Sequence, residues 1–240
     1  MAIINGGSGN NTLIGTNEND LINGFGGEDI ILGLPGNDRI FGGPDFDRID
    51  GQGGNDRIWG GGGIDFIAGG PDNDYINGQS GDDQLIGNFG DDRISGSIRN
   101  DYAAGNEGND TLFGGNGNDF FVGEEGIDTI YGQNGNGTGR DVLLGGEGLD
   151  AFVFNTRLNP QTNVDRIRDF NVADDTVWLN DNIFTQAGPV GTLWPMRSIS
   201  DPPPRTASST TRPRAGFTTI PTGAAPPARC CSPACPAVLP

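Results

Sequence analysis

Aspartate recurs at every ninth residue over most of the chain, and this spacing makes these side chains the first candidates for chemistry. A regular file of carboxylates repels itself unless a cation lies between its members. Calcium suits such a file because it takes about 6–8 oxygen ligands at about 2.3–2.6 Å, whereas magnesium needs near-octahedral geometry and keeps its waters. The candidate metal ligands are Asp20, Asp29, Asp38, Asp47, Asp56, Asp65, Asp74, Asp83, Asp92, Asp110, Asp119, Asp128, Asp141 and Asp150, with Asp101 as a weaker member.

These aspartates occupy the sixth position of a nine-residue repeat that begins at Gly6. Fourteen units run without a gap to Tyr131, a fifteenth carries a four-residue insertion near 136–139, and a sixteenth ends at Val153. Position 1 is Gly in all sixteen units, position 4 is Gly in twelve, and position 8 is always apolar. A glycine-rich disordered linker, the simplest alternative, has no reason to keep position 8 apolar.

The repeat predicts an all-β, right-handed parallel β-roll. Glycine at positions 1 and 4 is expected to allow the positive φ of a tight turn, and positions 7–9 are expected to form a short strand. Position 8 then points inward, while positions 7 and 9 point outward. Because one unit has one turn and one strand, two units close one coil, and sixteen units give about eight coils. Aspartates 18 residues apart should form two columns, one starting at Asp20 and the other at Asp29 and continuing to Asp141.

The pattern resembles the RTX (hemolysin-type) calcium-binding nonapeptide repeat over residues 6 to 153. The resemblance implies that position-6 carboxylates and turn carbonyls of two stacked units hold each Ca²⁺ ion. It further implies calcium-dependent folding, an extracellular location, a bacterial source and export by type I secretion machinery, which reads an uncleaved C-terminal signal. The carbonyls expected to take part lie near Gly24, Gly33, Gly42, Gly51, Gly60, Gly69, Gly78, Gly87 and Gly114.

Composition excludes several other functions. The chain has 43 glycines, a net charge of −18 and no histidine, so Ser-His-Asp catalysis and HExxH zinc sites are ruled out. Its acidity disfavours nucleic acid and anionic membranes as partners. No stretch approaches the roughly 20 apolar residues of a membrane span. The N-terminus lacks the charged and apolar regions of a cleaved secretory signal.

The eleventh unit, GSIRNDYAA, departs most from the pattern. Arg99 replaces the turn glycine and Ala103 thins the core. We therefore expect the site that uses Asp101 to be weak or empty, and the roll to break into two segments there.

The chain divides into a roll (1–153), a capping segment (154–190) and a Pro/Arg-rich tail (191–240). The capping segment resembles the one that follows RTX repeats in serralysin-type proteins, with Asp165, Ile167, Asp169 and Phe170 as its core. Two hypotheses address the tail: out-of-frame translation, or a genuine disordered Pro-rich segment. A frameshifted C-terminus would lack the type I export signal.

Three functional interpretations remain open. The first is a non-enzymatic, secreted calcium-binding protein in which the ions act as structural elements. The second is the calcium-binding module of an exoenzyme (protease, lipase or alginate epimerase) whose catalytic domain is absent from this chain; a chain in which Met1 opens almost directly onto the repeats disfavours it. The third is an ice- or carbohydrate-binding solenoid, disfavoured because turn positions 2 and 3 vary widely.

Overall fold

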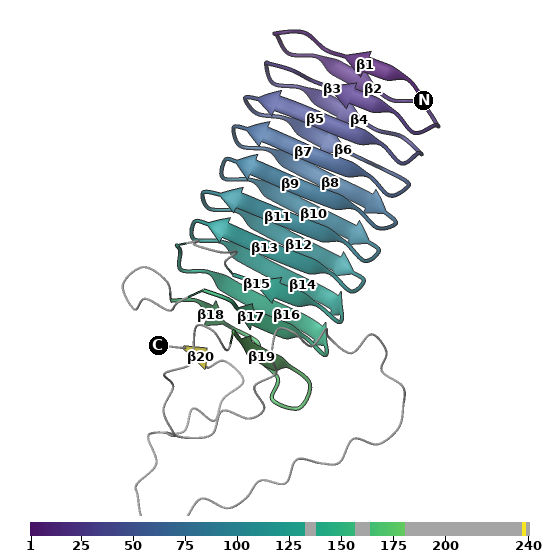
Figure 1. Cartoon of the computed structure of the whole chain (residues 1–240). Helices are drawn as coiled ribbons and strands as arrows, with labels where there is room; N and C mark the ends of the chain where they lie inside the picture. The colour runs from purple at the N-terminus through teal and green to yellow at the C-terminus, as the bar shows by residue number, and fades with distance from the viewer. Residues whose placement is uncertain (133–137, 157–163, 181–236, 239–240) are drawn as a thin grey trace, which may run out of the picture.

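The computed structural model describes residues 1–132, 138–156, 164–180 and 237–238. The described part is built from strands that wind into a flattened solenoid of about eight coils (Figure 1). Within that part, no helix is long and apolar enough to cross a membrane. The predicted all-β parallel roll is therefore confirmed.

Alternate strands belong to opposite sheets, which we call the odd sheet and the even sheet after the strand numbers (Figure 1). The odd sheet has the order β1 (Ile3–Asn5), β3 (Leu21–Asn23), β5 (Arg39–Pro44), β7 (Arg57–Gly62), β9 (Tyr75–Ser80), β11 (Arg93–Ile98), β13 (Thr111–Asn116), β15 (Thr129–Tyr131), β17 (Ala151–Phe154) and β19 (Thr176–Leu179). The even sheet has the order β2 (Thr12–Ile14), β4 (Ile30–Leu32), β6 (Arg48–Asp50), β8 (Phe66–Pro71), β10 (Gln84–Phe89), β12 (Tyr102–Glu107), β14 (Phe120–Gly126), β16 (Val142–Gly148), β18 (Arg166–Ile167) and β20 (Ala237–Val238).

The stacking register is 18 residues, as two units per coil require. Ile58 of β7, for example, pairs with Ile76 of β9, and this pairing is parallel. Most central strands contain six residues rather than the expected three, because positions 2 and 3 of the next turn pair as well. The expectation of three-residue strands was wrong there. Because consecutive coils are in exact register, the first residues of each turn form backbone pairs with the equivalent residues of the next coil, as Gly43 does with Gly61.

Position 8 forms the core, as predicted. Its side chains are fully buried in every unit except at Leu13, which is 8% exposed. Position 9 does not always point to solvent: Phe113 and Val122 are 8% exposed and Ala104 is 5% exposed. Side chains at position 9 cover one another along the outside of the sheet, as in the stacked rings of Phe113 and Tyr131.

The role of the position-1 glycine also differs from expectation. Positive φ is found at position 2, for example at Phe25 (φ 73°) and Leu34 (φ 70°), and at position 4, for example at Gly54 (φ 108°). Position 1 does not appear among the residues with positive φ. It is glycine because a Cβ would collide with the carboxylate of the aspartate in the same unit and, at many positions, with a carbonyl oxygen of the neighbouring coil.

The roll does not break at the eleventh unit. β11 pairs with β9 and β13, and β12 pairs with β10 and β14, so both sheets pass through it without interruption. Arg99 adopts the left-handed conformation itself (φ 87°), and Ala103 is fully buried. The strain of a non-glycine residue at this φ is of order 1–2 kcal/mol, which the surrounding pairing tolerates.

Both ends of the roll extend beyond the sixteen units. At the start, β1 pairs with β3 and adds a strand before Gly6. At the end, β18 and β19 pair in parallel with β16 and β17, so residues 164–180 add a further coil. β20 pairs antiparallel with β18. The hypotheses of a disordered or frameshifted tail concern residues that lie, apart from 237–238, outside the described ranges.

Candidate metal centre

The position-6 aspartates form two continuous hydrogen-bonded columns. The backbone N–H of each aspartate donates to Oδ1 of the aspartate in the next coil; that of Asp74 donates to Asp92 at 2.7 Å. The column that starts at Asp20 reaches Asp150, because the N–H of Asp128 donates to it at 2.9 Å. The second column crosses the insertion, where the N–H of Asp119 donates to Asp141 at 2.9 Å. The structure thus places the predicted aspartates in the two predicted columns.

The second carboxylate oxygen of nearly every column aspartate is buried without a hydrogen-bond partner. Unpaired buried oxygens are costly and uncommon in proteins, so a regular series of them indicates a missing partner. A cation supplies what a carboxylate oxygen needs. The fourteen Oδ2 atoms belong to Asp29, Asp38, Asp47, Asp56, Asp65, Asp74, Asp83, Asp92, Asp101, Asp110, Asp119, Asp128, Asp141 and Asp150.

Main-chain oxygens of the adjacent coil converge on the same place. A Cβ built on Gly24 would lie 2.4 Å from Oδ2 of Asp29 and 2.3 Å from the carbonyl oxygen of Gly42. The same arrangement recurs around Gly42, with the carbonyl oxygen of Gly60 at 2.5 Å. Glycine at position 1 therefore leaves an oxygen-lined space that any side chain would fill. Oxygen donors from carboxylates and carbonyls are the set that Ca²⁺ takes.

The nine predicted carbonyl positions are not all equivalent. Those of Gly42, Gly51, Gly60, Gly69 and Gly78 face the Oδ2 atom of the preceding coil in the same column. The carbonyl oxygens of Gly24 and Gly33 instead approach Gly6 and Gly15 in the first coil. Gly87 and Gly114 adjoin the carboxylates of Asp92 and Asp119, with Cβ positions 2.1 and 2.6 Å from Oδ2.

Backbone atoms must supply most of the ligands. Within the described ranges, no three acidic, histidine or cysteine side chains gather at one point. Each coil contributes one carboxylate to each column, so a cation bound between two coils would have few side-chain ligands. Such a donor set, rich in carbonyls and low in charge, fits Ca²⁺ rather than Zn²⁺, which prefers nitrogen and sulfur ligands.

Burial makes these carboxyl groups weak acids. It raises the pKa of Asp92 to about 8; the hydrogen bond from the Asp74 N–H opposes this rise, and the carboxylates of Asp110 and Asp74 add to it. Burial likewise raises the pKa of Asp56, Asp101 and Asp128 to about 8. Protons and cations therefore compete for the same oxygens. Burial raises the pKa to about 7 for Asp65, Asp74 and Asp119, and to about 6 for Asp47, Asp83, Asp110 and Asp150. Burial and the carboxylate of Asp165 also raise the pKa of Asp141.

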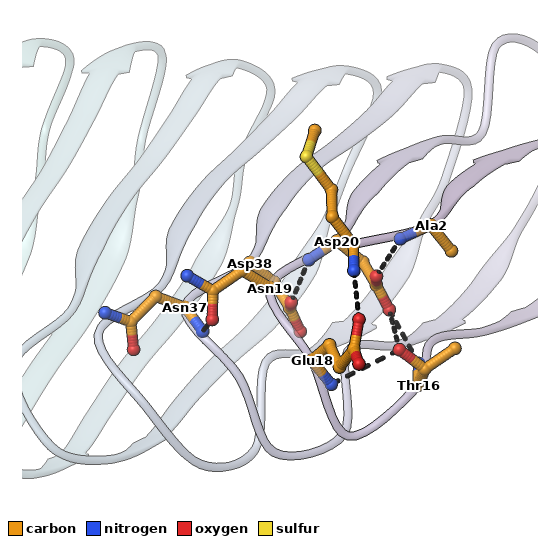
Figure 2. A network of polar contacts seen from close by, with 8 residues as sticks. Ala2, Thr16, Glu18, Asn19, Asp20, Asn37 and Asp38 are labelled. Carbon is orange, nitrogen blue, oxygen red and sulfur yellow. Dashed lines mark hydrogen bonds and ion pairs between the residues drawn. The ribbon is translucent and has the colours of Figure 1, made fainter.

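Asp20, at the head of its column, has a different environment (Figure 2). Its Oδ2 accepts hydrogen bonds from the backbone N–H and the hydroxyl of Thr16, each at 2.7 Å, and its Oδ1 accepts one from the N–H of Ala2. Burial raises its pKa, but these hydrogen bonds outweigh burial and leave the pKa below the ordinary value. Asp20 is therefore satisfied without a cation, unlike the fourteen aspartates that follow.

A second ladder runs beside the columns at position 5. The N–H of Asn37 donates to Oδ1 of Asn19 at 2.9 Å (Figure 2), and the N–H of Asn55 donates to Oδ1 of Asn37 at 3.0 Å. The sequence carries the signal for this ladder, because asparagine recurs every 18 residues at position 5, from Asn19 to Asn73. These amides hold the turns in register.

Two aspartates of the capping segment extend the columns. Oδ1 of Asp165 accepts the N–H of Asp141 at 3.1 Å, and Oδ1 of Asp175 accepts that of Asp150 at 3.2 Å. Sequence reasoning placed Asp165 in a cap and missed this role. The signal was present: Asp-Arg-Ile at 165–167 repeats positions 6–8 of several units, and Asp-Thr-Val at 175–177 is a variant of it.

The sequence pattern of a known family matches this chain. The family is described as the RTX calcium-binding nonapeptide repeat, in four copies, and it matches residues 5–40, 32–67, 59–94, 68–102, 95–130 and 114–136. No curated protein shows a significant match. The match covers the units whose aspartates form the two columns.

Proposed function

Because the chain belongs to the family of RTX calcium-binding nonapeptide repeats, we propose that it is an exported, non-catalytic protein that binds several Ca²⁺ ions along both aspartate columns and folds when they bind. Calcium binding follows from the family. The number of ions, the dependence of folding on them, export by type I secretion machinery and the absence of catalysis are proposed here.

The series of unpaired Oδ2 atoms carries the proposal. Each is buried, and each is flanked along its column by like groups. Without a cation the folded roll must either hold protons on these groups or bear their mutual repulsion. With a cation between coils, both costs disappear. Binding to the folded state alone then shifts the folding equilibrium by mass action.

Export fits this switch. RTX repeats are typical of secreted proteins, and calcium is scarce inside cells and abundant outside them. The chain would stay unfolded before export and fold after it. The lack of histidine and the engagement of every column aspartate with a backbone N–H support a non-catalytic role.

Metal analysis combined with limited proteolysis tests the proposal. The full chain is equilibrated with calcium, with magnesium or with chelator, and bound metal is counted by mass spectrometry after desalting. We expect several calcium ions per chain, no comparable uptake of magnesium, and protection of the roll from protease in calcium only. One ion or fewer per chain, or equal protection in chelator, would contradict the proposal.

A further inference from the structure

The outward surface of the odd sheet differs in charge from the rest of the molecule. The chain carries 32 acidic residues and a net charge of −18. Nevertheless, the ten strands of the odd sheet contain no aspartate or glutamate. They contain three arginines, namely Arg39, Arg57 and Arg93. In the even sheet, by contrast, four strands contain acidic residues, for example Asp50 in β6 and Glu107 in β12.

These three arginines form a row along the axis of the roll. Arg39 pairs in register with Arg57, Arg57 with Tyr75, and Tyr75 with Arg93. Adjacent strands lie about 4.8 Å apart, so the guanidinium groups project at intervals of one and two coils. Arg39 and Arg57 make no ion pair or hydrogen bond through their side chains to any described residue. Arg93 lies over the ring of Phe113, at 4.2 Å.

A ladder of aromatic rings adjoins this row and meets it at Tyr75. Phe41 and Trp59 stack face to face, with ring centroids 4.6 Å apart and 5° between their planes, and Tyr75 continues the series at 5.8 Å. Because the stacked faces cover each other, the ladder offers ring edges outward, and ring edges carry positive partial charge. The indole N–H of Trp59 has no acceptor among the described residues.

A shallow groove of about 580 Å³ crosses β5 to β11 next to the ladder. Glycines such as Gly61 form its floor, and Asn77, Gln79, Ser80 and Ser97 line it. The hydroxyl of Ser97 donates to Oδ1 of Asn77 at 3.1 Å, so this pair is already oriented. The Gln79 amide has no partner in the described part of the chain and is free to bind a hydroxyl group.

We propose that this arginine row and groove bind an acidic polysaccharide, with uronate carboxylates on the arginines and sugar hydroxyls on the amides and serines of the groove. The varied turn positions 2 and 3 disfavoured a carbohydrate-binding solenoid, but the arginines that would hold the carboxylates lie at position 7 and are in register. The spacing of charges along the partner favours a polysaccharide. Duplex DNA carries one charge per about 1.7 Å and would be repelled by the acidic remainder of the chain. A polyuronate carries one carboxylate per sugar, which matches arginines one and two coils apart.

Binding of short oligogalacturonides to the full chain in saturating calcium tests this proposal, with circular dichroism to show that each variant is folded. We expect the wild-type chain to bind them and to bind neither dextran oligomers nor duplex DNA of similar length. Each exposed arginine–carboxylate pair contributes up to about 1 kcal/mol, so Arg39→Gln/Arg57→Gln should weaken binding about tenfold. Trp59 fluorescence should change on binding, and Trp59→Phe should abolish that change.

Arg48→Gln is the matched control. Arg48 occupies position 7 like Arg57, but on β6 of the even sheet, where it lies over Phe66 at 4.9 Å. Its substitution should leave binding unchanged. No binding by the folded wild-type chain, equal binding of dextran or DNA, or an equal loss in Arg48→Gln would overturn the proposal. Because folding is measured separately, a failure of calcium-dependent folding is distinguishable from a failure of glycan binding.

Discussion

Replacing one column aspartate by asparagine should have opposite effects with and without calcium. In Asp92→Asn the amide oxygen can still accept the N–H of Asp74, which donates to Oδ1 of Asp92 at 2.7 Å. The substitution removes the ionisable group and the anionic ligand. Without calcium it should favour the roll, because no proton has to be taken up. With calcium it should reduce metal binding, because one carboxylate is lost from the column.

The sign of the pH dependence follows from the pKa. Burial raises the pKa of Asp92 from 3.8 in the unfolded chain to about 8 in the calcium-free roll. The stability from this group is therefore complete below the unfolded pKa and is lost as the pH rises through the folded pKa. The calcium-free chain should thus gain β structure on acidification from pH 8 toward pH 5.

The size of the effect can be worked out. At pH 7 the proton that Asp92 takes up on folding costs about 4 kcal/mol, because the carboxyl group has a pKa of 3.8 in the unfolded chain. Burial raises the pKa to about 6 or above for twelve aspartates. Each such group changes stability by up to about 1.4 kcal/mol per pH unit between its unfolded and folded pKa. Asp92→Asn should therefore raise the midpoint of acid-induced folding, because one fewer proton has to be taken up.

The assay is far-ultraviolet circular dichroism against pH in chelator, paired with a count of bound calcium at neutral pH. Asp91→Asn is the matched control, because Asp91 is exposed and its Oδ1 accepts the N–H of Asn109 at 2.8 Å, a role that asparagine fills elsewhere in that column. We expect Asp92→Asn to fold at higher pH and to lose at least one calcium ion. Asp91→Asn should keep its calcium and should shift the folding midpoint less, because the Asp91 carboxylate only adds to the raised pKa of Asp92 through its charge. A lower folding midpoint for Asp92→Asn, or unchanged calcium content, would refute the reasoning.

Three further substitutions probe other parts of the account. Gly42→Ala places a Cβ 2.4 Å from the unpaired carboxylate oxygen of Asp47, so calcium-dependent folding should be lost; proteolysis in saturating calcium would show this, and a fully protected variant would contradict it. Phe25 has a positive φ of 73° and an exposed side chain, so Phe25→Gly should relieve this strain and stabilise the roll by about 1 kcal/mol. Urea unfolding in calcium measures the change. Phe25→Ala keeps the strain and should not stabilise the roll. Asp101→Asn should lose less bound calcium than Asp92→Asn if the eleventh-unit site is weak, and an equal loss would show that site to be as strong as its neighbours.

The sequence carried enough information for the architecture because one register satisfies both core and turns. An apolar residue at position 8 in every unit requires a coil of 18 residues, and the pairing of Ile58 with Ile76 follows. The columns follow from the same register. The insertion near 136–139 could be assigned to a turn because the aspartate and the apolar residue resume their spacing after it.

The sequence did not predict the backbone conformation of individual turn residues or the contacts of individual atoms. In a sequence, a glycine that leaves room for neighbouring oxygen atoms cannot be distinguished from one that allows a positive φ. The prediction that the position-1 glycines adopt positive φ was therefore wrong. Tolerance also escaped prediction: Arg99 shows that a long side chain can adopt the turn conformation when neighbouring coils fix it. Asp165 and Asp175 were overlooked because the units around them lack the glycine turns that marked the others.

The most direct test of the central claim is a calcium titration of the full chain followed by far-ultraviolet circular dichroism, with magnesium as the control. The account predicts a cooperative change from coil to β structure at neutral pH with calcium alone. Persistent β structure in chelator at neutral pH would contradict it, because the roll would then be stable while its buried carboxylates lack a cation.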